Sequence, residues 1–186
     1  MSKTISGRDT PIRKKPFPEW PMFGEEEERQ VLEVLRSGQW GGHCRIKLPE
    51  FEEKFAAAHD AKYATACVNG TLAITTALRA AGVEAGDEVI IPSYTFIATA
   101  TACLMFGAIP VEKDALLIDP EKVEEAITNK TKAIIAVHIA GAPANMTRLK
   151  EIADKHGLKL VEDAAQAVGA KWEDRSVGAI GDLGAF

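Results

Sequence analysis

The chain has 186 residues and a formal net charge of −5 at pH 7; 46% of its residues are hydrophobic and 26% are charged. This balance is that of an ordinary water-soluble globular protein, and the length suits one domain with a sizeable core. The net charge and a lone basic cluster in a proline-containing tail argue against a nucleic-acid partner. No apolar run approaches the roughly 20 residues of a membrane span. We therefore expect a cytoplasmic protein with no membrane or nucleic-acid partner.

The three cysteines form no C-x-x-C pair, so the sequence predicts neither a disulfide framework nor a metal site. Residues 1–23 are polar and interrupted by prolines, which is typical of an N-terminal arm. A first helix is predicted over Glu25–Ser37, because acidic residues open it and Gly38 follows its end. A second helix is predicted to begin at Pro49.

From residue 63 onward, short apolar runs alternate with segments of helical period. The predicted strands are Tyr63–Val68, Glu88–Ile91, Ile109–Val111, Ala133–Val137 and Lys159–Glu162. The predicted helices are Thr71–Ala81, Thr95–Phe106, Pro120–Ile127, which Asp119 caps, and Met146–His156. This alternation predicts an α/β fold with a mainly parallel sheet and helices on both faces, where ligands bind at the carboxyl ends of strands.

Asn69-Gly70-Thr71 lies where a predicted strand turns into a helix. The first backbone amides of a helix have no acceptor within it, so they can bind a phosphate. The alternative is an ordinary helix cap, which this segment taken alone favours. No G-x-G-x-x-G, G-x-x-x-x-G-K-[ST] or G-x-S-x-G motif is present, so the usual dinucleotide, nucleotide and serine-hydrolase signatures are missing.

Three further side chains follow predicted strands. Asp163 could hold a proton on a pyridine nitrogen or cap a helix, and the sequence does not separate the two. Phe96 could stack on a planar ring, although an aromatic residue at a helix start more often belongs to the core. For His138 a structural hydrogen bond is favoured over acid–base chemistry, because the sequence supplies it no partner.

Four segments, taken together and in this order, closely resemble the DegT/DnrJ/EryC1/StrS aminotransferase family. They are Cys67–Ala73 (CVNGTLA), Asp87–Thr99 (DEVIIPSYTFIAT), Val161–Ala170 (VEDAAQAVGA) and Gly181–Phe186 (GDLGAF). The resemblance runs from about residue 23 to residue 186. It implies a fold-type-I, aspartate aminotransferase-like enzyme that uses pyridoxal 5'-phosphate (PLP). Residues 24–186 would then be part of its PLP-binding large domain, with the C-terminal half of the fold outside this chain.

The resemblance also implies roles for individual residues. Gly70 and Thr71 would bind the cofactor phosphate through their amides, and Phe96 would stack on the ring. Asp163 would pair with the pyridine nitrogen and thereby take part in catalysis. Gln166 would lie beside the ring near its phenolic oxygen.

The family's usual reaction moves an amino group from glutamate or glutamine to a keto sugar, and its members are typically homodimers. The segment Phe17–Pro21 resembles the opening of the branch that aminates cyclitols. In the family, the lysine that forms a Schiff base with the cofactor follows shortly after the segment matching Gly181–Phe186. Lys159 and Lys171 do not stand at that place, so we expect the 186 residues alone to be inactive.

Two alternatives stay open. A dehydratase of the same family carries histidine at the lysine position, and a noncatalytic module would bind the cofactor without forming a Schiff base. A departure from the family pattern lies at Glu112–Ile118, which is several residues shorter than usual. This shortening puts an edge strand and its loop in doubt.

Overall fold

The structure is a computed structural model that describes residues 13–40, 47–113 and 117–186. The chain divides into two compact units, Met1–Lys47 and Leu48–Phe186. The first unit contains α1 (Glu25–Ser37), which has the predicted bounds and ends at Gly38 in the left-handed conformation. No residue of α1 is buried. No helix among the described residues is long and apolar enough to cross a membrane.

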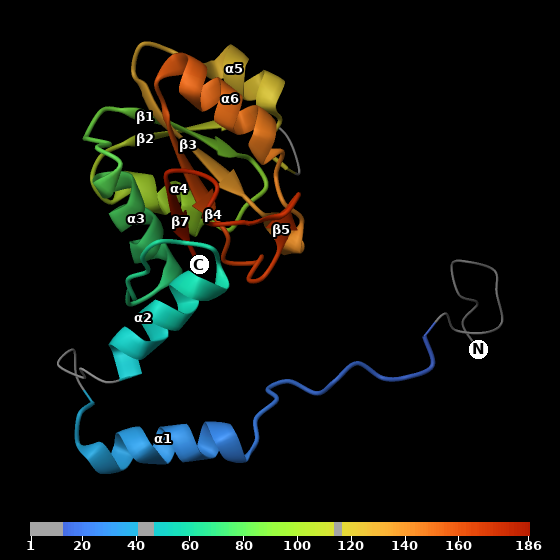
Figure 1. Cartoon of the computed structure of the whole chain (residues 1–186). Coiled ribbons are helices and arrows are strands. Elements are labelled where there is room, and N and C mark those ends of the chain that lie inside the picture. Colours follow the sequence, from blue (N-terminus) through green and yellow to red (C-terminus); the bar gives the residue numbers. More distant parts are fainter. Residues whose placement is uncertain (1–12, 41–46, 114–116) are drawn as a thin grey trace. The chain divides into compact units, whose positions relative to one another are not determined.

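The second unit is built on a five-stranded sheet in the order β2-β1-β3-β4-β7 (Figure 1). Its strands are β1 (Glu88–Pro92), β2 (Ile109–Lys113), β3 (Thr131–Val137), β4 (Lys159–Asp163) and β7 (Leu183–Ala185). All neighbouring strands of this sheet run parallel, as the alternating pattern predicted. The carboxyl ends of these strands therefore meet at one edge.

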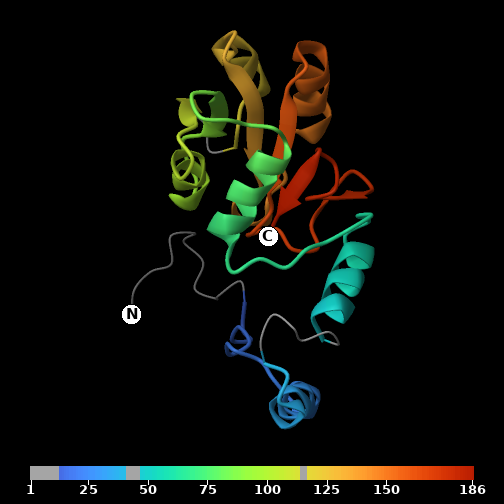
Figure 2. The same ribbon diagram turned by 90° about the vertical axis from the view of Figure 1, so that its left-hand side faces the viewer.

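Helices cover both faces of the sheet, as predicted (Figures 1 and 2). The second unit's helices are α2 (Lys47–Ala58), α3 (Gly70–Ala80), α4 (Ala98–Leu104), α5 (Pro120–Ala126), η1 (Ile139–Gly141) and α6 (Met146–His156). The core beneath α5 and α6 receives Ile134 and Ala136 from β3, while the core beneath α3 and α4 receives Ile135 and Val137. Alternate side chains of a strand point to opposite faces, so a strand covered on both faces is apolar throughout.

The predicted caps explain where several helices begin. Asn69 caps α3 by accepting a hydrogen bond from the amide of Leu72 at 3.0 Å. Asp119 caps α5 by accepting from the amides of Glu121 and Lys122. Each cap satisfies backbone donors that have no partner within the helix, so these helix starts could be predicted from local sequence.

One predicted strand is wrong. Residues 63–68 form no strand. The first and last residues of this segment are exposed to solvent, Tyr63 by 78% and Val68 by 86%. The apolar run crosses the surface toward α3 without a partner strand, and strand propensity expresses side-chain packing more than backbone preference. The predicted helix Thr95–Phe106 shortens to Ala98–Leu104, because Thr95 and Phe96 lie in the turn that follows β1.

The short elements near the C-terminus were not predicted by periodicity. They are β7 and the antiparallel pair β5 (Lys171–Trp172) and β6 (Arg175–Ser176). Strands of two or three residues carry too little alternation to be recognised. At the shortened segment, β2 forms and pairs with β1 along its whole length, while residues 114–116 lie outside the described residues.

A buried carboxylate ties the sheet to the loop between β6 and β7. Glu162 is fully buried in β4 and accepts hydrogen bonds from the amides of Gly178, Ile180 and Gly181 at 2.6–2.8 Å. His138, also fully buried, lies with Nε2 3.0 Å from the same carboxylate. The amide of Ala144 donates to Nδ1 of His138 at 3.0 Å, so the ring proton is on Nε2 and is donated to Glu162. The carboxylate thus has four donors.

Glu162→Gln should destabilise the protein by about 3 kcal/mol, because the new amide group would face two donors, the Gly178 amide and His138 Nε2. His138 cannot relieve the conflict by moving its proton, since its Nδ1 accepts from Ala144. Urea denaturation measures the loss. Glu151→Gln is the matched control: Glu151 is exposed and pairs with Arg148, so its loss should cost less than about 1 kcal/mol. Equal losses in the two variants would contradict the assigned role of Glu162.

The same carboxylate makes stability depend on pH. Burial would raise the pKa of Glu162, but the hydrogen bonds from His138 and the three amides outweigh it and hold the pKa below its ordinary value of 4.5. The resulting stabilisation is fully present above that ordinary value and is lost as the pH falls toward the lowered folded-state value. The difference in unfolding free energy between the wild type and Glu162→Gln should therefore narrow below about pH 4.5. Denaturation at a series of pH values tests this, and a difference independent of pH would contradict it.

Candidate functional site

A pocket of about 300 Å³ lies where the sheet's strands end beside the start of α3. It is lined by the ends of β3, β4 and β7 and by the turn after β1, and ligands usually bind at the carboxyl ends of strands in such sheets. Its lining residues are Asn69, Gly70, Thr71, Ile74, Thr95, Phe96, Ala98, Val137, Asp163, Ala165, Gln166, Ala185 and Phe186. The five predicted site residues, Gly70, Thr71, Phe96, Asp163 and Gln166, are thus brought together in one pocket.

One wall of the pocket is the first turn of α3. The side chain of Asn69 binds the amide of Leu72, so the amides of Gly70 and Thr71 are the ones that open the helix at the pocket. A Cβ atom at Gly70 would lie 3.7 Å from the carbonyl oxygen of Phe186. The backbone is therefore close to the end of β7 here. The positive end of the helix faces the pocket, where it can attract an anion.

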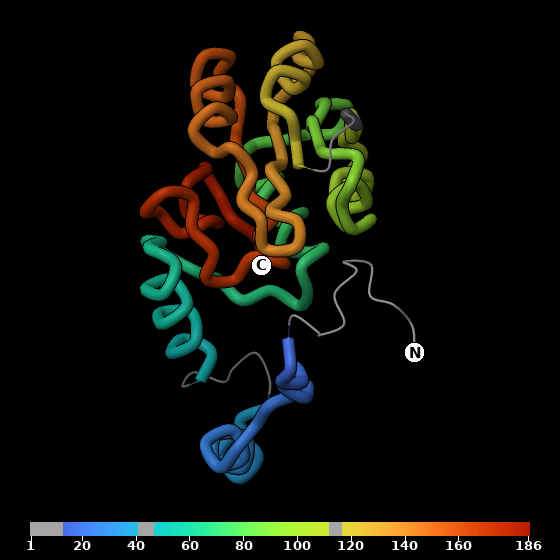
Figure 3. Tube along the Cα trace, turned by 90° about the vertical axis from the view of Figure 1, so that its right-hand side faces the viewer, coloured from blue at the N-terminus to red at the C-terminus, as the bar shows by residue number. Residues whose placement is uncertain are grey.

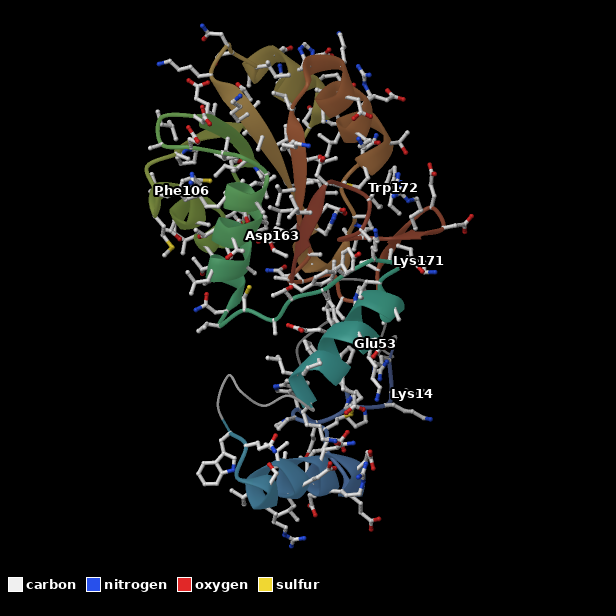
Figure 4. The ribbon with its side chains drawn as sticks, turned by 60° about the vertical axis from the view of Figure 1, so that its left-hand side comes forward. Lys14, Glu53, Phe106, Asp163, Lys171 and Trp172 are labelled. Carbon is white, nitrogen blue, oxygen red and sulfur yellow. The ribbon has the colours of Figure 1, made fainter. Side chains whose placement is uncertain are left out.

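Asp163 ends β4 and is 7% exposed (Figure 4). Its Oδ2 accepts from the hydroxyl of Thr99 at 2.9 Å, and its Oδ1 accepts from the amide of Ala165 at 3.3 Å. It does not cap a helix, which was the alternative left open by the sequence. Among the described residues that line the pocket, Asp163 is the one charged side chain. The Asp163 carboxylate can therefore act as the counterion of a positively charged group on a bound ligand.

Phe96 and Gln166 enter the pocket from loops after β1 and β4. The ring of Phe96 is 69% exposed, so the packed core leaves most of it free to contact a ligand. The Oε1 atom of Gln166 accepts from the amide of Ala140 at 2.7 Å. This bond fixes the carboxamide and leaves Nε2, a donor, available to the pocket.

His138 has the structural role that was favoured for it, with Glu162 as the partner that the sequence did not reveal. Thr99 was missed, although it is completely buried and contacts Asp163 directly. A usable signal was present. Thr95 and Thr99 are four residues apart, the spacing that places side chains on one face of a helix.

Phe186 closes the pocket on the side of the β6–β7 loop. Its ring packs edge-on against Phe55, with the ring centroids 4.9 Å apart. Figure 3 shows this C-terminal segment next to the chain that leads from α2 into α3. Gly178 has a φ of +88°, and a Cβ atom there would lie 2.3 Å from Cζ of Phe186. The absence of a side chain at Gly178 thus makes room for the phenyl ring.

Gly178→Ala should cost about 3 kcal/mol, because it adds left-handed backbone strain to a collision with the Phe186 ring. Gly157→Ala is a matched control: Gly157 has a φ of +66° but no atom within 4 Å of the added Cβ, so strain alone should cost about 1 kcal/mol. Thermal and urea unfolding of both variants compare the two effects. If both variants lose the same stability, the collision with the Phe186 ring adds nothing to the backbone strain, and the predicted effect of the close packing is wrong.

Comparison with known proteins agrees with this fold. The model of the DegT/DnrJ/EryC1/StrS aminotransferase family matches residues 21–186. The L-glutamine:2-deoxy-scyllo-inosose aminotransferase of Streptomyces kanamyceticus is 43% identical over 100% of this chain and 45% of its own length. The chain belongs to the DegT/DnrJ/EryC1/StrS aminotransferase family.

Solved structures of aminotransferases have the same fold as this chain. The aminotransferase from Psychrobacter cryohalolentis superposes with a TM-score of 0.86 and 44% identity, over 91% of this chain and 44% of that one. A relative from Streptococcus pneumoniae, solved in its PLP form, gives a TM-score of 0.80 and 31% identity over 88% of this chain and 46% of that one. Family members therefore bind PLP. The chain spans about 45% of the length of the curated relatives that it matches.

Proposed function

We propose that the whole protein containing this chain is a PLP-dependent aminotransferase that transfers an amino group from L-glutamine or glutamate to a keto cyclitol or keto sugar. The observation that carries this proposal is the common pocket of Gly70, Thr71, Phe96, Asp163 and Gln166. These residues lie up to 96 positions apart in the sequence, from 70 to 166. Family membership supports the reaction class.

The lining offers chemical groups that suit the phosphate, the ring and the ring nitrogen of PLP. The cofactor phosphate would bind to the amides of Gly70 and Thr71 at the positive end of α3. Phe96 would lie against one face of the ring, since an exposed aromatic at a pocket wall gains contact by stacking. The free donor of Gln166 would reach the ring's oxygen substituent, while its Oε1 stays bound to Ala140.

Asp163 would supply the charge that the chemistry needs. When bound, PLP acts as an electron sink for the substrate carbon that loses or gains a proton. A carboxylate opposite the ring nitrogen favours the protonated nitrogen, because the opposite charge stabilises the charged form. Asp163 is nearly buried, so water screens this interaction little. This residue would hold the nitrogen's proton throughout the reaction.

The substrate class rests on the relatives. Two aminotransferases that act on scyllo-inosose derivatives, and are named for L-glutamine as donor, are 42–43% identical over nearly the whole chain. This sequence identity covers the part of the relatives that corresponds to the pocket residues, and it supports a keto cyclitol as amino acceptor and glutamine as amino donor. A dehydratase or a noncatalytic module has no specific observation in its favour.

The transfer should require more of the protein than residues 1–186. No lysine is present among the described residues that line the pocket. The Schiff-base lysine is expected in the part of the whole protein that corresponds to the remaining length of its relatives. Residues 1–186 alone are expected to hold part of the cofactor site without transferring an amino group.

A homodimer is the proposed assembly. The turn before α4 carries Tyr94, Phe96 and Ile97, and Leu104 and Met105 lie at the other end of α4. All five side chains are more than half exposed. Clustered apolar groups of this kind mark an interaction surface. Because Phe96 also lines the pocket, a subunit interface here would reach the edge of the site.

The intact protein should bind PLP, and borohydride should fix the cofactor to a lysine peptide. With 2-deoxy-scyllo-inosose and L-glutamine, it should then form an aminated cyclitol detectable by mass spectrometry. Asp163→Ala should lower the rate at least about a hundredfold, because the ring nitrogen loses its counterion. Loss of water from the substrate without use of an amino donor would point to the dehydratase instead. Absence of any PLP binding would reject the proposal.

A further inference from the structure

Two threonine hydroxyls lead from the pocket wall to Asp163. The Oγ1 of Thr99 lies 2.9 Å from Oδ2 of Asp163, and the Oγ1 of Thr95 lies 2.8 Å from that of Thr99. Thr99 is completely buried in α4, while Thr95 is half-buried and lines the pocket. The contact joins residues 64 positions apart, so it depends on the assembled fold.

The direction of these hydrogen bonds follows from the donors available. An ionised carboxylate only accepts, so the single hydroxyl proton of Thr99 goes to Asp163. Thr99 must then accept from Thr95, whose own proton is thereby used. Thr95 presents only oxygen lone pairs to the pocket. The chain of donors runs from Thr95 to Thr99 to Asp163.

We propose that Thr99 is a positioning residue, which sets the orientation of Asp163 toward the cofactor's ring nitrogen, and that Thr95 supports Thr99 from the pocket wall. This inference rests on the proposed function. It concerns residues to which neither the sequence motifs nor the comparisons give a role.

The geometry shows why Asp163 needs such a residue. The last torsion of an aspartate side chain is soft, so hydrogen bonds decide the plane of the carboxylate. Oδ1 is held by the Ala165 amide at 3.3 Å, whereas Oδ2 has the shorter bond to Thr99 at 2.9 Å.

The same turn links the two sides of the ring site. The amide of Thr99 donates to the carbonyl oxygen of Phe96 at 3.1 Å. A movement of Thr99 would therefore shift both the carboxylate of Asp163 and the backbone of Phe96, the residue proposed to stack on the ring. Burial of Thr99 between these groups gives it few alternative positions.

The test compares Thr99→Val with Thr99→Ser in the intact protein. Valine keeps the branched shape and removes the hydroxyl, while serine keeps the hydroxyl. Thr101→Val is the matched control, because Thr101 lies on the same helix and its hydroxyl binds only the carbonyl oxygen of Ala98 among the described residues, at 3.3 Å. The ligands are PLP and an analogue with C–H in place of the ring nitrogen. Dissociation constants come from fluorescence titration.

Thr99→Val should weaken PLP binding about tenfold, and binding of the analogue by less than about twofold, because the analogue has no nitrogen for Asp163 to face. Thr99→Ser and Thr101→Val should both stay within about twofold of the wild type. The bound-cofactor absorbance of Thr99→Val should also change with pH at lower values than in the wild type, since the ring nitrogen would lose its proton more easily.

Equal effects of Thr99→Val on both ligands, or no difference from Thr101→Val, would overturn the positioning role. If Thr99→Val fails to fold, Thr95→Val decides instead: it leaves the buried hydroxyl in place and should weaken PLP about threefold with the same dependence on the ring nitrogen. A wild-type protein that binds neither ligand would reject the proposed function itself. A wild type that binds PLP, with variants that behave alike, would reject the role of Thr99 alone.

Discussion

The carboxylate of Glu162 is the interaction on which the site edge of the fold depends. It lies inside the sheet; one of its four donors is His138, which directly follows β3, and the other three come from the loop that leads to β7. An isolated charge could not remain there, because burial without partners would cost far more than the fold's net stability. Three donors are amides of one loop and the fourth is the ring of His138, so the carboxylate holds that loop and the segment after β3 against β4.

Glu162 and Asp163 show how neighbouring carboxylates acquire different roles. Adjacent residues of a strand point to opposite faces, so one is directed into the core beneath α6 and the other toward the pocket. Glu162 accepts enough hydrogen bonds to be a structural anchor. Asp163 has two and keeps capacity for a ligand. Backbone geometry therefore separates the structural carboxylate of Glu162 from that of Asp163, whose functional role is proposed.

Local signals predicted much of this fold, and long-range contacts account for what was missed. Asn69 and Asp119 cap their helices through amides two or three residues away, so sequence patterns could reveal them. The strand predicted at residues 63–68 failed because no partner strand lies beside it, which local propensity cannot report. Asp163 and Gln166 reach the pocket at and after the end of β4, and Phe96 reaches it in the turn after β1. Gly70 and Thr71 reach it from the start of α3, and the roles of all five residues stay predictions. The Thr99–Asp163 contact spans 64 residues and had no local signature beyond the spacing of two threonines.

The place of β7 in the sheet, next to β4 at the end of the strand order, has a consequence for assembly. This strand is short, adds to the sheet's edge through β4, and carries Ala185 and Phe186 into the pocket wall. Pairing β7 with β4 requires closure of the connection between residues 163 and 183, which is slower than forming local helices, so the other strands can pair before the pocket is complete. A ligand that binds only the closed pocket would then select the molecules in which β7 is docked. If the pocket binds the cofactor proposed above, the supply of that cofactor would influence how many molecules reach the docked state, in addition to any effect on the rate of a reaction.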